Sequence, residues 1–167
     1  MDFVDIVLDY NDDLARELKK LGFKKIILMQ NDKLFDPQEA DHFTLSVYSK
    51  GSYISAIRKG AVQAISGIAA NKVVLDPGLC KKLKESRSFV IFDFKSLVTS
   101  KNYFDVYKLY LRNSTLCNEH GVDALFVSAA ERINEVKSPI QLVSFALEFR
   151  YNYSNFRRAS ERFISEF

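Results

Sequence analysis

The sequence is poor in the residues that build metal centres and disulfide frameworks. It contains two histidines, two cysteines and no tryptophan among 167 residues. Metal sites need several His, Cys or acidic ligands that converge on one point. Cys80 and Cys117 are too few and too far apart in the sequence for a disulfide framework or a zinc knuckle. We therefore expect two buried free thiols.

Long apolar stretches are absent as well. No run of the sequence approaches the roughly 20 apolar residues that a helix needs to cross a bilayer. Asp2 and Asp5 stand where a secretory signal peptide would carry basic residues. These absences predict a protein that makes no membrane contact and that functions in the cytoplasm.

Glycine is scarce, with six residues in the chain. No Gly-rich fingerprint follows any expected strand, which argues against dinucleotide binding. The sequence also lacks the Gly-x-Ser-x-Gly elbow and a plausible Cys–His nucleophile pair. The chain is therefore poorly equipped to act as an enzyme by itself.

What the sequence does contain is an ordinary globular composition with a mild positive charge. Hydrophobic residues make up 47%, charged residues 27%, and the net charge is +3. These values argue against disorder, and the length suits a single domain over residues 1–167. The charge is compatible with nucleic-acid binding but does not require it.

Apolar runs and amphipathic segments alternate along the chain in a βα pattern, which predicts an α/β fold with a parallel sheet. The expected strands cover residues 3–8, 24–29, 43–48, 62–65, 88–94 and 124–127, and the segment 31–41 reads as a loop. A complete TIM barrel has eight strands and typically ~250 residues. We therefore expect a reduced or incomplete TIM-like (β/α) barrel of about six strands.

The last two predicted helices each have an apolar side that should face the core. One begins at Ser138, a good cap, followed by Pro139 at the first helical position. Helical spacing predicts that Ile140, Val143, Ala146 and Leu147 pack on the sheet. In the final helix, from about residue 153, we expect Phe156, Phe163 and Ile164 inside and Arg157, Arg158 and Arg162 outside. Tyr151 and Tyr153 beside it are expected to be exposed.

Several basic residues follow the expected strands. Because the carboxyl ends of parallel strands meet at one edge of a sheet, cations just beyond them should gather there. A basic rim without catalytic groups suits binding to the phosphate backbone of RNA. The predicted RNA-binding residues are Lys72, Lys95, Arg132 and Lys137, with Arg112 in the long helix 102–120 as a further candidate.

The segment after the last strand resembles a family signature. A strand that ends in Ser128 and two alanines, followed by a loop and by Lys137-Ser138-Pro139-Ile-Gln-Leu, is similar to ribonuclease P protein component 3, with Lys137 and Gln141 in place of the family's usual Arg and Asp. Ser128, Ser138 and Pro139 are the structural residues of this motif. Segments 59–66, 75–78, 90–97 and 102–103 also resemble the family. Between Met29 and Phe43 the chain lacks about one βα unit that longer members carry.

The resemblance implies a non-catalytic RNA-binding subunit. The ribonuclease P holoenzyme removes the 5′ leader from precursor tRNA, and its RNA holds the catalytic site and the Mg²⁺. The protein itself is then expected to bind no cofactor. It would contact the ribonuclease P RNA and pair with ribonuclease P protein component 2, in a heterotetramer, and meet precursor tRNA through the holoenzyme.

Two other interpretations remain. A metal-dependent phosphoesterase of the histidinol phosphatase type shares a related barrel, and Asp5, Asp9, Asp93 and His42 are the residues that would have to hold its metal. Alternatively, the basic rim could dock an acidic protein partner, which would make the chain a scaffold.

Overall fold

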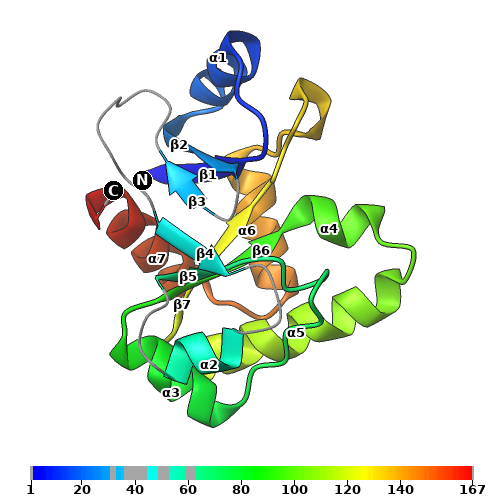
Figure 1. Cartoon of the computed structure of the whole chain (residues 1–167). Coiled ribbons are helices and arrows are strands. Elements are labelled where there is room, and N and C mark those ends of the chain that lie inside the picture. Colours follow the sequence, from blue (N-terminus) through cyan, green and yellow to red (C-terminus); the bar gives the residue numbers. More distant parts are fainter. Residues whose placement is uncertain (1, 31–32, 36–44, 49–52, 59–62, 167) are drawn as a thin grey trace.

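The computed structural model of the chain describes residues 2–30, 33–35, 45–48, 53–58 and 63–166. Strands lie at its centre and helices surround them, as Figure 1 shows. The α/β class that the sequence predicts is confirmed by this alternation of elements. Among the described residues, no helix is both long and apolar enough to span a bilayer.

The described strands form one sheet whose order follows the sequence from β1 to β7. Strands β1 and β2 pair in parallel, and so do β4 with β5, β5 with β6 and β6 with β7. The strands are β1 (Phe3–Val7), β2 (Phe23–Gln30), β3 (Lys33–Phe35), β4 (Leu45–Tyr48), β5 (Ala64–Ile65), β6 (Phe89–Asp93) and β7 (Asp123–Val127).

Strand β3 departs from the prediction. The segment 31–41 was expected to be a loop, but Lys33–Phe35 pairs antiparallel with β2 on one side and with β4 on the other. A strand without a crossover helix can return only in the antiparallel sense. This short strand therefore links β2 to β4 within the sheet. The predicted parallel sheet of about six strands is interrupted at this point by an antiparallel strand.

The two ends of the sheet lie side by side. The backbone N–H of Ala129 donates to the carbonyl of Ile6 (3.0 Å), and the N–H of Leu8 donates to the carbonyl of Ala130 (2.9 Å). Strand β1 is thus bonded to the segment that directly follows β7. These two bonds cover part of the edge that β1 would otherwise present.

Both faces of the sheet are buried, which explains why its strands read as continuous apolar runs. Alternate strand residues enter two apolar clusters, as Val90 and Phe92 do in one and Phe89 and Ile91 in the other. The first cluster packs against helices α1, α3, α5 and α6, and the second includes Ala159 and Phe163 of α7.

Several helices begin at capping residues, among them Ser138, the cap that the sequence predicts. Asn11, Asp76 and Ser138 each accept a backbone N–H of the following turn, and Gly121 ends the longest helix with a positive φ of 66°. The helices are α1 (Asp12–Lys20), α2 (Tyr53–Arg58), α3 (Pro77–Glu85), α4 (Phe94–Thr99), α5 (Tyr103–His120), α6 (Pro139–Glu148) and α7 (Tyr153–Glu166), with a 3-10 turn, η1, at Ile133–Glu135.

Helix α4 was not predicted. It begins directly after β6, and Asp93 caps it by accepting the N–H of Ser96 at 2.6 Å. Its six residues are too few to show helical periodicity in the sequence. Lys95 is consequently in the first turn of a helix and not in a free loop.

The inward face of α6 differs in part from the expected one, although Ala146 is buried and Val143 packs against the core as predicted. Ile140 is 77% exposed and Leu147 is 50% exposed, whereas the buried side chains include Leu142, Phe145 and Ala146. Both sets repeat at helical spacing, so periodicity alone could not choose between them. The aromatic ring of Phe145 decides, because it packs edge-on against Phe126 of β7 at 5.3 Å between centroids.

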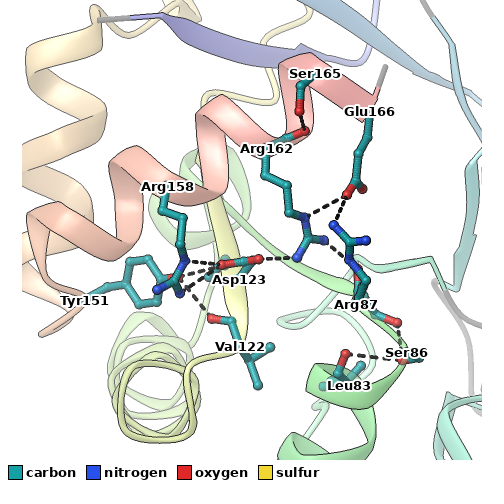
Figure 2. Close-up of polar contacts among 12 residues, drawn as sticks. Leu83, Ser86, Arg87, Val122, Asp123, Tyr151, Arg158, Arg162, Ser165 and Glu166 are labelled. Atoms are coloured by element: carbon teal, nitrogen blue, oxygen red, sulfur yellow. Dashed lines mark hydrogen bonds and ion pairs between the residues drawn. The ribbon is translucent and has the colours of Figure 1, made fainter.

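Helix α7 is fastened to the sheet by a cluster of charges, shown in Figure 2. The carboxylate of Asp123 at the start of β7 is almost fully buried and accepts hydrogen bonds from the guanidinium groups of Arg158 and Arg162. Arg162 also lies over the ring of Phe89 at 3.9 Å. Its side chain is 18% exposed, so the prediction that it points outward is wrong.

The predicted exposure of Tyr151 is also wrong. It is fully buried, and its hydroxyl accepts the N–H of Ala124 and donates to the carbonyl of Val122. Tyr153, by contrast, is 48% exposed, as expected.

The buried charge cluster around Asp123 predicts that replacing Asp123 lowers the free energy of unfolding much more than replacing Glu161, a carboxylate on the surface of α7. Replacing Asp123 by Ala leaves two guanidinium groups without their shared partner and should lower the free energy of unfolding by about 3 kcal/mol. Replacing Glu161, whose ion pair with Arg157 is exposed, should cost about 0.5 kcal/mol or less. Urea unfolding of the two variants measures this, and equal losses would contradict the role given to Asp123.

Candidate nucleic-acid interface

The candidate site is built on the contact between Asp5 and Ser128. Asp5, in the middle of β1, is fully buried. Its carboxylate accepts the backbone N–H of Ser128 at 2.7 Å and also the Ser128 hydroxyl proton. Its own strand adds the N–H of Ile6 at 2.9 Å. The predicted motif residue Ser128 thus joins the first strand to the start of the loop that follows β7.

Burial raises the pKa of Asp5 to about 7. The hydrogen bonds from the Ser128 hydroxyl and N–H act in the opposite direction, as does the positive charge of Lys137, but desolvation outweighs them. A carboxyl group with this pKa in a structural position links the stability of the loop to pH.

Lys95 is held by the same loop. Its ammonium lies 2.8 Å from a carboxylate oxygen of Glu131 and 3.2 Å from one of Glu135. Burial alone would lower the pKa of Lys95, but these hydrogen bonds raise it overall. The charge of Lys95 is therefore already balanced within the chain, so it positions the loop after β7 and adds little to a basic surface.

Lys137 and the capped start of α6 lie at the end of this loop. The Lys137 ammonium lies 4.9 Å from the centroid of the Phe94 ring. Ser138 and Gln141 then form a capping box, since each side chain accepts the backbone N–H of the other residue, at 3.3 and 2.8 Å. Gln141, which stands where the resembling family has Asp, is thus a competent partner for the cap.

Arg132 faces a broad depression between the start of α1 and η1. The depression measures about 940 Å³ and is lined by Arg132 together with Asp9, Asp13 and Glu131. Arg132 is exposed, but the acidic side chains share its surroundings. The expected basic rim is therefore interrupted by acids on this side.

Lys72 and Arg112 lie on a different part of the surface, at α5. Asn113 of α5 is buried, and its side-chain amide donates to the carbonyl of Val73 (2.7 Å) and accepts the N–H of Leu75 (3.0 Å). These bonds hold the loop after β5 against α5. Lys72 directly precedes Val73 in that loop, and Arg112 directly precedes Asn113 in the helix.

Lys72 also lines a smaller depression, of about 320 Å³, with Asn102 and Asp105 among its other walls. Both Lys72 and Arg112 are exposed. The structure thus separates the predicted cations into two groups: Lys95, Arg132 and Lys137 at the loop after β7, and Lys72 and Arg112 at α5.

The carboxylates considered as metal ligands have other partners. Asp5 binds Ser128, and Asp93 caps α4 and accepts the hydroxyl of Tyr110 at 3.2 Å. Within the described residues, no group of three or more His, Cys, Asp or Glu side chains is placed to hold a metal ion. His42 lies outside the described residues.

Sequence reasoning missed the partners of the cations. Glu131 and Glu135 stand four apart in the loop after β7, a spacing that could have suggested a shared cation, but Lys95 is 36 residues upstream of the nearer one and only the fold brings it there. The Asp5–Ser128 contact spans 123 residues, and no local pattern signals it.

Comparison with known proteins finds a likeness in three-dimensional structure. No family model matches the sequence, and no curated protein matches it. Among solved structures, a chain in the cryo-EM structure of archaeal ribonuclease P with mature tRNA is similar in three dimensions. The TM-score is 0.68 at 14% identity, over 95% of this chain and 90% of that chain. The two chains share a fold.

The pKa of Asp5 predicts a specific pH dependence. An unfolded Asp titrates near 3.9, so between about pH 4 and 7 the folded state holds a proton that the unfolded chain has released. The contribution of Asp5 to stability therefore falls as the pH rises through this window. Asp5→Asn keeps an acceptor for the Ser128 N–H but does not titrate.

Urea unfolding at pH 5 and pH 8 tests this. The wild type should lose stability relative to Asp5→Asn as the pH rises, and parallel curves would contradict the raised pKa. Asp5→Ala, which leaves the buried Ser128 N–H without an acceptor, should cost about 2 kcal/mol at pH 5.

Proposed function

We propose that the chain is a protein subunit of ribonuclease P of the archaeal type, corresponding to protein component 3. The observation that carries this is the fold shared over 95% of the chain with a component of archaeal ribonuclease P. The sequence motif around Ser128, Ser138 and Pro139 supports it independently. We interpret the sheet, whose ends are bonded through Ala129 and Ala130, as a reduced TIM-like barrel.

In this proposal the protein supplies contacts and the RNA supplies the chemistry. Lys72, Arg112 and Arg132 are exposed and have no ion-pair partner in the part of the chain that the structure describes. They would neutralise phosphates of the ribonuclease P RNA and so stabilise its active fold. Lys95 and Lys137 would order the loop after β7. The Mg²⁺ needed for cleavage would sit on the RNA, and the protein would bind no cofactor.

Protein component 2 is the partner expected from the family resemblance, in a heterotetramer. The exposed apolar residues Ile140 and Leu147 on α6 are the kind of side chain that a protein interface buries. Precursor tRNA would meet the chain through the assembled holoenzyme, in the cytoplasm.

The proposal predicts a result in reconstitution. Ribonuclease P RNA and component 2 from the same organism should cleave the 5′ leader of precursor tRNA faster at moderate Mg²⁺ when this chain is added. Omitting component 2 should remove most of the gain. An unchanged cleavage rate with the complete set would refute the assignment.

A second prediction concerns the cations at α5. The double variant Lys72→Gln/Arg112→Gln should lower the slope of log affinity against log salt for the RNA by about 0.7 to 0.9 per lost phosphate contact. Lys19 and Lys81 are also exposed but lie on α1 and α3, so Lys19→Gln/Lys81→Gln is the matched control. Equal slopes for the two double variants would remove Lys72 and Arg112 from the interface.

A further inference from the structure

An exposed aromatic pair stands at the beginning of α5. Phe104 is 75% exposed and Tyr103 is 44% exposed. Their rings meet edge to face, with centroids 5.8 Å apart and planes at 77°. Tyr103 also lies 6.0 Å from Tyr107, whose hydroxyl donates to Glu148 of α6 at 2.7 Å. The pair is therefore supported from behind while the face of Phe104 stays open to solvent.

Cations follow Phe104 along the same face of the helix. Lys108 and Arg112 stand four and eight residues after it, so all three share one stripe. Lys101 precedes Phe104 by three residues, just before the helix begins. Phe104, Lys101, Lys108 and Arg112, here called the α5 stripe, are all exposed. Its three cations have no ion-pair partner among the described residues.

The surroundings of the stripe add further positive charge. Lys72 is held next to α5 through the bonds of Asn113 to the neighbouring loop residues. The acidic residues of the same helix are Asp105, which lines the depression beside Lys72, and Glu119 near the helix end. Glu148, which accepts the hydroxyl of Tyr107, is a third acid beside the helix. Four cations against three acids leave a small positive excess here, in contrast to the acidic surroundings of Arg132.

An apolar ring flanked by unpaired cations fits one kind of polyanion particularly well. Each nucleobase has a flat face that stacks on an aromatic ring, while Lys and Arg one helical turn away neutralise the adjoining phosphates. In duplex RNA the base faces are covered by their neighbours, so stacking on a protein ring requires an unpaired nucleotide.

From these observations we infer that the α5 stripe binds a single-stranded segment of RNA, with an unpaired base stacked on Phe104 and phosphates on Lys101, Lys108 and Arg112. This inference rests on the proposed function and narrows it, because it names the surface and the form of the RNA. It also accounts for a large aromatic side chain that remains exposed beside three cations.

The absence of tryptophan from the chain makes the stacking directly measurable. Phe104→Trp would be the sole tryptophan of this chain. Titration with a 12-nucleotide single-stranded RNA should quench its fluorescence, and a 16-base-pair RNA duplex should quench it far less. Equal quenching by both, or none by the single strand, would overturn the stacking.

Affinity measurements separate the ring from the charges. Phe104→Ala should weaken single-strand binding about tenfold, the scale of one base–aromatic stack, and leave the salt slope unchanged. Lys101→Gln/Lys108→Gln should lower the salt slope. Tyr153→Ala is the matched control for Phe104, because Tyr153 is an aromatic residue that is 48% exposed on α7. If Phe104→Ala binds RNA as tightly as Tyr153→Ala does, the inference is wrong.

The same titrations distinguish this failure from that of the proposed function. A wild-type protein that binds neither the single strand nor the complete ribonuclease P RNA refutes both proposals. Binding of the complete RNA by the wild type and all stripe variants alike refutes the stripe alone. Loss of component 2 binding in Phe104→Ala, with RNA binding intact, would assign the surface to the protein partner and likewise overturn the inference.

Discussion

The carboxylate of Asp5 connects the two ends of the sheet. It accepts the N–H and the hydroxyl of Ser128, and directly beyond this point the backbones of β1 and the segment after β7 bond to one another. The loop that begins there carries Glu131 and Glu135, which fix Lys95, and leads to the capped start of α6. A buried carboxylate is costly unless its hydrogen bonds are made, so the loop geometry depends on this contact.

The distribution of charge is more informative than its sum. The net charge of +3 says little about a partner, because several cations serve the fold: Lys95 holds a loop, and Arg158 and Arg162 fasten α7 to Asp123. The cations left for other molecules are those without such partners. Four of them, Lys72, Lys101, Lys108 and Arg112, lie on or beside α5, where Phe104 adds an apolar face. This combination is the reason that we propose an RNA contact there.

Local signals in the sequence were sufficient for much of the fold. The cap at Ser138 located the start of α6, because capping is decided within a few residues. Strand β3 and helix α4 were missed, since three and six residues are too short to show a period. The exposure of Ile140 and Leu147 on α6 and the burial of Arg162 were predicted wrongly. Both depend on partners, Phe126 and Asp123, that are distant in the sequence.

In the candidate site, too, features set by neighbouring residues could be predicted and features set by distant partners could not. The motif at Ser138–Pro139 was readable because a capping box is local. The RNA-binding roles predicted for Lys72 and Arg112 stay predictions, although both side chains are exposed. The balance of Lys95 by Glu131 and Glu135, and the acids around Arg132, required the three-dimensional structure. Phe104 gave no signal either, because an aromatic residue at the start of a helix usually belongs to the core.

The most direct test of the account is a footprint of the lysines in the assembled particle. Acetylation rates, measured by mass spectrometry with and without ribonuclease P RNA, would report which side chains the RNA covers. The account predicts that Lys72, Lys101 and Lys108 are slowed several-fold while Lys19 and Lys81 react as before. Unchanged rates at the three α5-side lysines in a particle that cleaves precursor tRNA would contradict it.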